Sequence, residues 1–150
     1  MKHFYFYDSP VGRVYIAESA GCITDLVFKP VCDALEKETP LITRAIDMLR
    51  EYFDGTRKDF DGLPINPAGT EFQKKAWNAL LAIPYGETRS YKEQAEAAGN
   101  VKACRAVGAA NGKNPISIII PCHRVIGSNK KLTGYGGGLD IKKALLELEA

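Results

Sequence analysis

The residues best suited to chemistry are three consecutive side chains near the end of the chain, Cys122, His123 and Arg124. A free cysteine has a pKa of about 8.5, so only a few per cent of it is thiolate at neutral pH. A nucleophilic cysteine therefore needs a base or a cation, and here both follow directly. Neighbouring residues on an extended strand point to opposite faces, so contact requires a bend, which Pro121 favours. The alternative is a buried cysteine that only packs; the spacing fits no closed zinc site.

A second candidate is a helix expected over residues 102–110. At about 100° per residue, its inward face gathers Ala103, Ala106, Val107 and Ala110. The opposite face carries Arg105, Gly108, Ala109 and Gly112. Glycine costs about 1 kcal/mol inside a helix, so this bare face needs a reason. One reason is close approach to a DNA minor groove, about 6 Å wide. The other reason is a close contact with a second helix, or a glycine that simply ends the helix. The pattern of this helix alone does not distinguish these explanations.

The charge is unevenly distributed along the 150 residues. Residues 1–69 hold 8 basic and 11 acidic side chains, a net charge of −3, and residues 70–150 hold 12 and 7, a net charge of +5. Residues 72–143 alone carry +8. A basic half on a near-neutral chain indicates either a polyanionic partner such as nucleic acid or a solvated lysine-rich surface.

The elements that must position these residues begin with three aromatic or β-branched runs, over 4–7, 14–17 and 23–28. They predict a small antiparallel sheet of three strands. Thr39 and Pro40 then read as the N-cap and first residue of a helix that ends near Asp54. A linker rich in proline follows at 63–69. We therefore expect an α+β protein with an N-terminal domain over 1–66 and a mostly helical C-terminal domain over 67–150.

The second half opens with two capping boxes, Thr70–Gln73 and Ser90–Glu93. The helix that follows Ser90, together with the 102–110 helix, makes a helix-turn-helix candidate. Residues 116–120 read as a buried extended run that leads to Cys122. A last helix, capped by Asp140, is expected to face inward through Ile141, Ala144, Leu145 and Leu148.

Taken together, these segments resemble one protein family. The matching stretches are Ile120–Val125 with Asn114-Pro115 before it, Gly134–Leu139, Ile83–Tyr91, Arg105–Ala110 and Leu145–Glu149. They are similar to the methylated-DNA–protein-cysteine methyltransferases, which act on O6-alkylguanine in DNA. The likeness covers essentially all of residues 70–150. The N-terminal half matches more loosely, through its strand pattern and Ser9–Gly12, and the family would make it a ribonuclease H-like α/β domain.

The resemblance implies a reaction that each molecule performs once. Cys122 would accept the alkyl group from O6-alkylguanine, and O4-alkylthymine is left open as a second substrate. His123 would act on the thiol through a water, oriented by Glu149. Tyr91 would donate a proton to N3 of the base, and Asn114 would brace the cysteine segment. The product thioether is a poor leaving group, so the protein would be a methyltransferase that is consumed by its own reaction.

The resemblance also implies how DNA is bound. Docking would be in the minor groove of double-stranded DNA, with the damaged base rotated out of the stack and Arg105 filling the gap. The DNA-binding residues would be Arg105, Ala106, Gly108, Ala109, Gly112 and Arg124. The base-binding residues would be Val125, Tyr135, Gly136 and Gly137. Some relatives have serine where Gly136 stands, so this loop would offer one polar contact fewer.

No cofactor and no metal are expected. Some relatives hold zinc with two cysteines and two histidines, whereas this chain has His3, Cys22 and Cys32 but no second histidine before His123. We further expect no membrane association, a monomer and a cytoplasmic location. The competing hypotheses are a lesion sensor of the same fold without transfer, a cysteine hydrolase or small-molecule transferase, and a sequence-specific regulator. Cys122 with His123 and Glu149 argues against the sensor, and a regulator would leave the Pro121–Val125 motif and Tyr91 unexplained.

Overall fold

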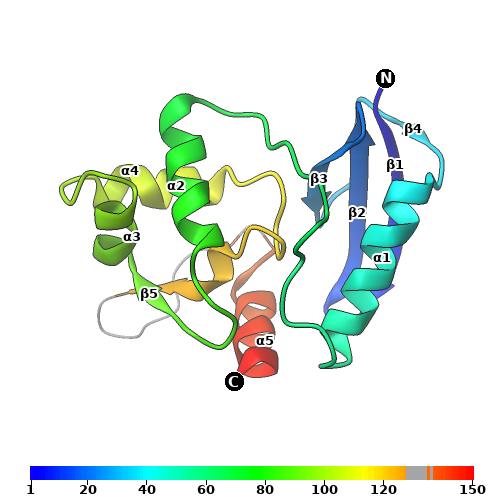
Figure 1. Cartoon of the computed structure of the whole chain (residues 1–150). Helices are drawn as coiled ribbons and strands as arrows, with labels where there is room; N and C mark the ends of the chain where they lie inside the picture. The colour runs from blue at the N-terminus through cyan, green and yellow to red at the C-terminus, as the bar shows by residue number, and fades with distance from the viewer. Residues whose placement is uncertain (128–134, 136) are drawn as a thin grey trace. The chain divides into compact units, whose positions relative to one another are not determined.

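Two compact units, Met1–Ala68 and Gly69–Ala150, make up the chain. The computed structural model describes residues 1–127, 135 and 137–150 (Figure 1). The fold class is α+β, as predicted.

The first unit is a sheet covered by one helix. Its strands β1 (His3–Ser9), β2 (Gly12–Ser19), β3 (Cys22–Val27) and β4 (Leu35–Glu36) lie in the order β3-β2-β1-β4. The three expected strands pair antiparallel. The sequence did not reveal β4, a two-residue strand parallel to β1, because so short a segment carries no periodicity.

Helix α1 (Pro40–Phe53) forms where the sequence places its start signal. The hydroxyl of Thr39 accepts a hydrogen bond from the amide of Ile42 at 3.2 Å, and proline occupies the first turn. The helix buries one apolar face, which consists of Ile42, Ala45, Ile46, Met48, Leu49 and Tyr52. That face and the buried strand residues Val14, Ile16, Ile23 and Leu26 form an apolar core.

The second unit is mostly helical. Its elements are α2 (Glu71–Leu81), β5 (Arg89–Ser90), α3 (Tyr91–Ala97), α4 (Cys104–Gly112), the 3-10 helix η1 (Cys122–Arg124), β6 (Val125–Ile126) and α5 (Leu139–Glu149). Both predicted capping boxes are present, one at Thr70 and Gln73 and one at Ser90 and Glu93. They fix where α2 and α3 begin.

Helices α2, α3 and α4 share a core of small residues, Ala76, Ala95, Val107 and Ala110. Trp77 is buried beside them and donates its ring N–H to the carbonyl of Ala110 at 2.9 Å. The predicted inward face of α4 is only half right. Val107 and Ala110 are buried, but Ala106 is exposed and the helix begins at Cys104. The buried face is narrow because only Val107 and Ala110 enter the core that α4 shares with Ala76 of α2 and Ala95 of α3.

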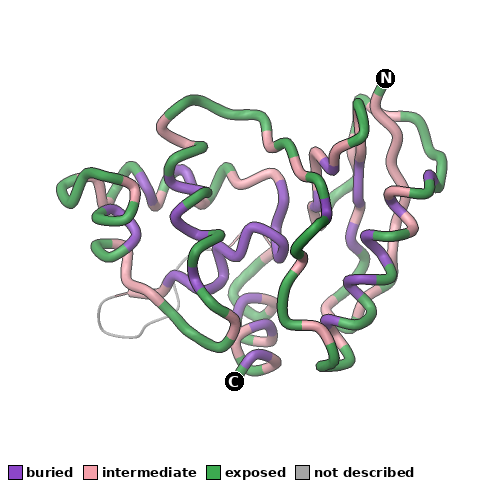
Figure 2. The backbone as a smooth tube through the Cα atoms, in the orientation of Figure 1, coloured by how far each residue is buried: buried purple, intermediate pink, exposed green. Residues whose placement is uncertain are grey.

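The run at 116–120 is buried, as predicted, but it is not extended. It is a tight turn, in which the amide of Ile120 bonds the carbonyl of Ile116 at 3.0 Å and Ile118 adopts a left-handed φ of 71°. Every residue from 116 to 125 is buried, which Figure 2 shows as one continuous purple segment. The protein therefore encloses the whole chain segment around Cys122.

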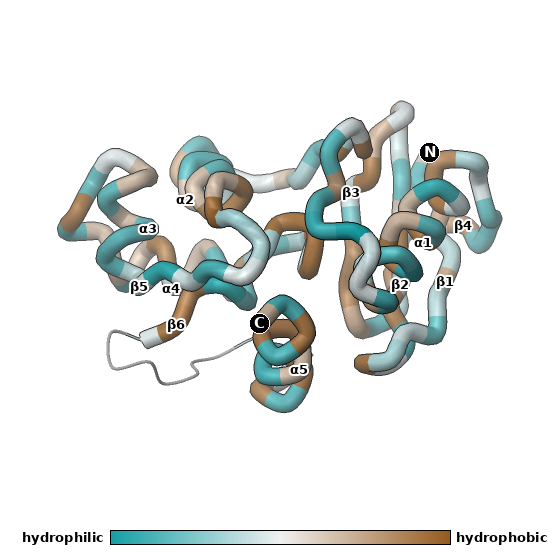
Figure 3. The backbone as a smooth tube through the Cα atoms, turned by 60° about the horizontal axis from the view of Figure 1, so that its bottom comes forward, coloured by the Kyte–Doolittle hydropathy of each residue, from teal (hydrophilic) through white to brown (hydrophobic). Residues whose placement is uncertain are grey.

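The buried face of helix α5 matches the one that hydropathy predicts only at Leu145. The buried residues are Lys142, Leu145 and Glu149, whereas Ile141, Ala144 and Leu148 are half-buried. Hydrophilic and hydrophobic segments accordingly alternate along this helix (Figure 3). Its N-cap is Gly138 rather than Asp140, with no side-chain capping bond. The inward face of α5 therefore brings two charged side chains into the unit.

Candidate functional site

Cys122, His123 and Arg124 form one turn of 3-10 helix directly after Pro121. The turn provides the bend that contact between the first two side chains requires. Cys122 is 7% exposed, His123 is fully buried and Arg124 is 8% exposed. All three side chains therefore lie inside the protein, where the environment sets their charge states.

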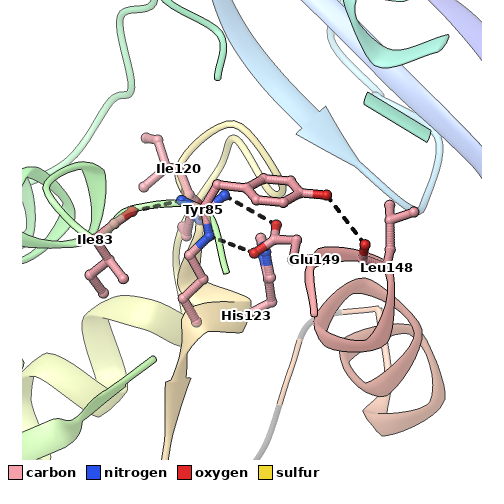
Figure 4. Close-up of polar contacts among 8 residues, drawn as sticks. Ile83, Tyr85, Ile120, His123, Leu148 and Glu149 are labelled. Atoms are coloured by element: carbon pink, nitrogen blue, oxygen red, sulfur yellow. Dashed lines mark hydrogen bonds and ion pairs between the residues drawn. The ribbon is translucent and has the colours of Figure 1, made fainter. Parts of the chain in front are cut away.

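Glu149 joins His123 and Arg124 from the end of α5. Its Oε2 lies 2.7 Å from Nε2 of His123, and its two oxygens lie 2.8 and 3.1 Å from Nε and Nη2 of Arg124. Figure 4 shows Glu149 beside His123, with Tyr85 next to them. A carboxylate accepts hydrogen bonds and cannot donate them. The histidine proton therefore resides on Nε2, which leaves Nδ1 as the basic nitrogen.

Arg124, expected on the DNA-binding surface, is not available there. Besides Glu149, it donates from Nη1 to the carbonyl of Ile83 at 2.7 Å and lies 5.8 Å from the centre of the Tyr85 ring. Tyr85 in turn donates to the carbonyl of Leu148 at 3.2 Å (Figure 4). The burial of Arg124 and its bonds to Glu149 and Ile83 therefore argue against the predicted contact with DNA. The arginine holds the acid in place, and no local sequence signal distinguishes that role from a phosphate contact.

Burial controls the charge states of the cysteine and the histidine. Desolvation raises the pKa of Cys122, while the Asn114 side chain and the positive charge of Lys142 oppose the shift. Desolvation lowers the pKa of His123 despite its contact with Glu149. At neutral pH Cys122 is thus a protonated thiol and His123 a neutral imidazole.

Asn114 ties the turn before the cysteine. Its amide nitrogen donates to the carbonyl of Ile120 at 2.9 Å, and its amide oxygen accepts from the backbone N–H of Ile116 at 3.0 Å. Both ends of the 116–120 turn are thereby held by one side chain, which agrees with a bracing role.

Lys142 is a site residue that sequence reasoning missed. It is 1% exposed and donates from Nζ to the carbonyl of Val125 at 2.6 Å. Desolvation lowers its pKa, and the interaction with Cys122 opposes that shift. The available signal was its spacing of three and seven residues from Leu145 and Glu149, which places it on their face of the helix.

A two-residue parallel ladder connects Tyr91 to this region. Ser90 pairs with Ile126 and Arg89 pairs with Val125, so the start of α3 lies beside the chain that leaves the cysteine. Tyr91 is the first residue of α3, and a Cβ on Gly108 would lie 3.7 Å from its ring. The ladder thus brings Tyr91 near residues predicted to bind the base.

Tyr135 and Gly137 are half-buried, and Gly136 lies outside the described residues. The hydroxyl of Tyr135 is buried, and desolvation followed by the interaction with Cys122 raises its pKa well above the ordinary range. Tyr135 therefore keeps its phenol proton next to the cysteine.

The outer face of α4 is open. Arg105, Ala106, Ala109 and Gly112 are exposed, and a Cβ on Gly112 would meet nothing within 4 Å. Within the described part of the chain, the Arg105 side chain has no hydrogen-bond or ion-pair partner. The helix thus presents one cation on a surface almost free of bulk.

Residues 1–127, 135 and 137–150 contain no group of three or more acidic, histidine or cysteine side chains that could hold a metal ion. Among these same residues, no helix has both the length and the apolar composition to cross a bilayer.

Comparison with known proteins matches both units. A family model described as the DNA binding domain of 6-O-methylguanine DNA methyltransferase matches residues 71–150, and one described as its ribonuclease-like domain matches residues 2–67. The methylated-DNA–protein-cysteine methyltransferase of Methanosarcina acetivorans is 48% identical over 153 residues, covering 98% of this chain and 97% of its own. The constitutive one of Bacillus subtilis is 45% identical over 159 residues, covering 99% and 96%.

Solved structures agree with these matches. The crystal structure of Mycobacterium tuberculosis OGT in complex with DNA has a TM-score of 0.91 and 48% identity, covering 98% of this chain and 92% of that one. The O6-methylguanine methyltransferase of the same organism also scores 0.91, at 46% identity over 99% of this chain and 93% of that one. The chain therefore belongs to the 6-O-methylguanine DNA methyltransferase family.

Proposed function

We propose that this protein repairs DNA directly, by transferring a methyl or other alkyl group from O6 of guanine to the sulfur of Cys122. Its relatives bear the name of that activity at 45–48% identity. The main structural support for the proposal is that Cys122, His123 and Glu149 are all buried. Nε2 of His123 lies 2.7 Å from Oε2 of Glu149. We include O4-alkylthymine, which presents the same oxygen–alkyl bond, as a second substrate.

His123 is proposed as the base that activates the thiol. It is neutral because burial lowers its pKa, and Glu149 fixes the proton on Nε2. Among the described residues, Nδ1 is buried with no hydrogen-bond partner. Nδ1 would take the thiol proton through a water molecule, and the imidazolium would be stabilised by Glu149. This arrangement of nucleophile, base and orienting acid is typical of enzymes that activate a weak nucleophile.

The transfer itself exchanges one bond for another. The bond from sulfur to the alkyl carbon forms as the bond from that carbon to O6 breaks, and its electron pair stays on guanine. Tyr91 would donate its phenol proton to N3 and so neutralise the leaving base. The thioether left on Cys122 is a poor leaving group, so one molecule would repair one lesion.

The damaged base must leave the duplex to reach a cysteine that is 7% exposed, at a cost of a few kcal/mol. We propose that α3 and α4 act as a helix-turn-helix that docks in the minor groove, with Arg105 entering the stack. Ala106, Gly108, Ala109 and Gly112 would let the helix backbone approach closely. The base would then contact Val125, Tyr135, Gly136 and Gly137.

The remaining proposals concern the whole chain. We propose a monomer with an N-terminal domain over 1–66 and a catalytic, DNA-binding domain over 67–150. The four cysteines are free thiols, which favours a reducing compartment, and we propose a cytoplasmic location.

The decisive experiment is intact mass spectrometry after mixing the protein with a duplex that contains one O6-methylguanine. The wild-type chain should gain about 14 Da, one methylene equivalent, because the thiol becomes a methyl thioether. Cys122→Ala should gain nothing, and Cys104→Ala should behave like the wild type. Tight binding of the lesion without any gain in mass would favour a lesion sensor of the same fold.

A further inference from the structure

A pair of side-chain amides links α3 to α4. Nε2 of Gln94 donates to Oδ1 of Asn111 at 2.8 Å, and Nδ2 of Asn111 donates back to Oε1 of Gln94 at 2.8 Å. Nε2 of Gln94 also donates to the carbonyl of Ala76 in α2 at 3.1 Å. Gln94 is 2% exposed, so these bonds are made largely out of water.

This pair of hydrogen-bonded amides lies next to a core that is otherwise apolar. The core that α2, α3 and α4 share consists of small apolar side chains, whose attraction is non-directional. Such a surface allows one helix to slide or rotate on another at little cost. Hydrogen bonds, in contrast, weaken steeply away from the preferred distance and angle. Besides the amides, the Trp77 bond to the carbonyl of Ala110 ties α4 to α2. The amides therefore restrain the position of α4 on α3.

Asn111 lies in the last turn of α4, the helix that carries the exposed Arg105. Its backbone carbonyl accepts the amide of Asn114 at 3.2 Å, and Asn114 holds the turn before Cys122. A rotation of α4 about its axis would move Arg105 away from the groove and would also pull on this turn. The amide pair is thus connected both to the helix that carries Arg105 and, through Asn114, to the turn before Cys122.

We propose that Gln94 and Asn111 are positioning residues, which hold α4 at the angle that duplex DNA requires. The inference rests on the proposed function, and it predicts a defect confined to DNA substrates. Neither residue touches the thiol, so reaction with the free base O6-methylguanine, which needs no docked helix, should not depend on them.

The test is the double variant Gln94→Leu with Asn111→Leu, in the full chain. Removing both partners of a buried hydrogen bond is far milder than removing one, so the double variant should keep the thermal midpoint of the wild type. We expect about a tenfold lower rate of methyl transfer from duplex DNA, within the hundredfold that a misplacement of about 1 Å can cause. The rate with free O6-methylguanine should stay within about twofold of the wild type. Gln73→Leu, which removes an amide from the start of α2 only, is the matched control.

Several outcomes would overturn the proposal. An equal loss with the duplex and the free base would mean a general structural role, and no loss with the duplex would mean no role in docking. If the double variant does not fold, the exchange variant Gln94→Asn with Asn111→Gln, which keeps both amides, takes its place and should retain most of the duplex rate. A failure of the proposed function is seen separately, as a wild-type protein that transfers no methyl group. In that case affinity for unmodified duplex still tests the amide pair, because a positioning role predicts that the leucine pair weakens it at an unchanged thermal midpoint, whereas a general structural role lowers the midpoint as well.

Discussion

The two units of this protein differ in how many polar and charged side chains they bury. In Met1–Ala68, all of which the structure describes, the one buried polar side chain is Thr39, an N-cap. None of its ion pairs is buried: the side chains of Arg13 and Asp8 are 48% and 65% exposed, and those of Lys2 and Asp25 are 26% and 21% exposed. Among its described residues, the second unit buries six polar side chains, which are Gln94, Ser117, His123, Arg124, Lys142 and Glu149.

Burying an ion costs several kcal/mol unless its partner and its hydrogen bonds are well placed. An apolar core would stabilise the second unit at least as well, as it does the first. The contrast indicates that the second unit buries charge for chemistry, because groups with perturbed pKa values gather at functional sites.

The strongest test of this contrast is Glu149→Gln. An amide has one acceptor oxygen in place of two, so it cannot accept all three bonds that His123 and Arg124 make to Glu149. The arginine is then buried without its carboxylate. We expect a loss of about 3–5 kcal/mol in the free energy of unfolding and of about 10²–10⁴ in the rate of methyl transfer. Urea unfolding and single-turnover kinetics measure the two effects. Glu147→Gln, on the exposed side of the same helix, is the control and should change neither.

Gly69→Ala should have the next largest effect, through packing and not charge. A Cβ at this position would lie 2.5 Å from the ring of Trp77, which is 1% exposed and anchored to Ala110. Overpacking of this kind costs about 1–3 kcal/mol, so the thermal midpoint should fall. Gly112→Ala, where the added atom meets open space, should leave the midpoint unchanged or raised. Equal midpoints for the two variants would contradict the described position of Trp77.

Lys142→Met tests whether the buried cation assists the thiol. Its charge lowers the pKa of Cys122, so its removal should raise that pKa further and move the alkylation profile of Cys122 to higher pH. Below the new midpoint the variant should therefore react more slowly than the wild type. Carbamidomethylation of Cys122 by iodoacetamide, in which sulfur displaces iodide, is followed by peptide mass across pH 6–10 (a window of about two units around an ordinary thiol pKa) and measures the shift. A Lys143→Met protein, altered at the exposed neighbour, should match the wild type.

The smallest effect is expected for Asp8→Asn in the first unit. The Arg13 side chain lowers the pKa of Asp8 through a hydrogen bond, but water screens a pair so exposed. The thermal midpoint should not change measurably. A fall comparable to that of Glu149→Gln would show that the first unit also depends on its charges.

The sequence predicted the features that a few neighbouring residues encode. Thr39, Thr70 and Ser90 each cap a helix as predicted, because a cap is decided by residues within one turn. The three long strands were also predicted, from their runs of aromatic and β-branched residues. The motif around Cys122 was specific enough to indicate the family, which the comparisons then showed.

The features that were missed depend on contacts between distant residues. Arg124 and Glu149 are 25 positions apart, and nothing in either neighbourhood indicates that they pair. Hydropathy also fails to predict the burial of Lys142 and Glu149 in α5, because it assigns lysine and glutamate to the surface. The pattern at 116–120 predicts an extended run and not a turn, because four isoleucines around one serine look the same in either conformation.

That turn contains Ile118, a β-branched residue in the left-handed region with its side chain 1% exposed. Relaxing the backbone there requires withdrawing the side chain from the core, so the segment cannot open alone. The amides of Ile119, Ile120 and Cys122, which bond to carbonyls within 116–120, should therefore exchange with deuterium together. Their protection should match that of the most stable helices of the unit, since exchange must await its global unfolding.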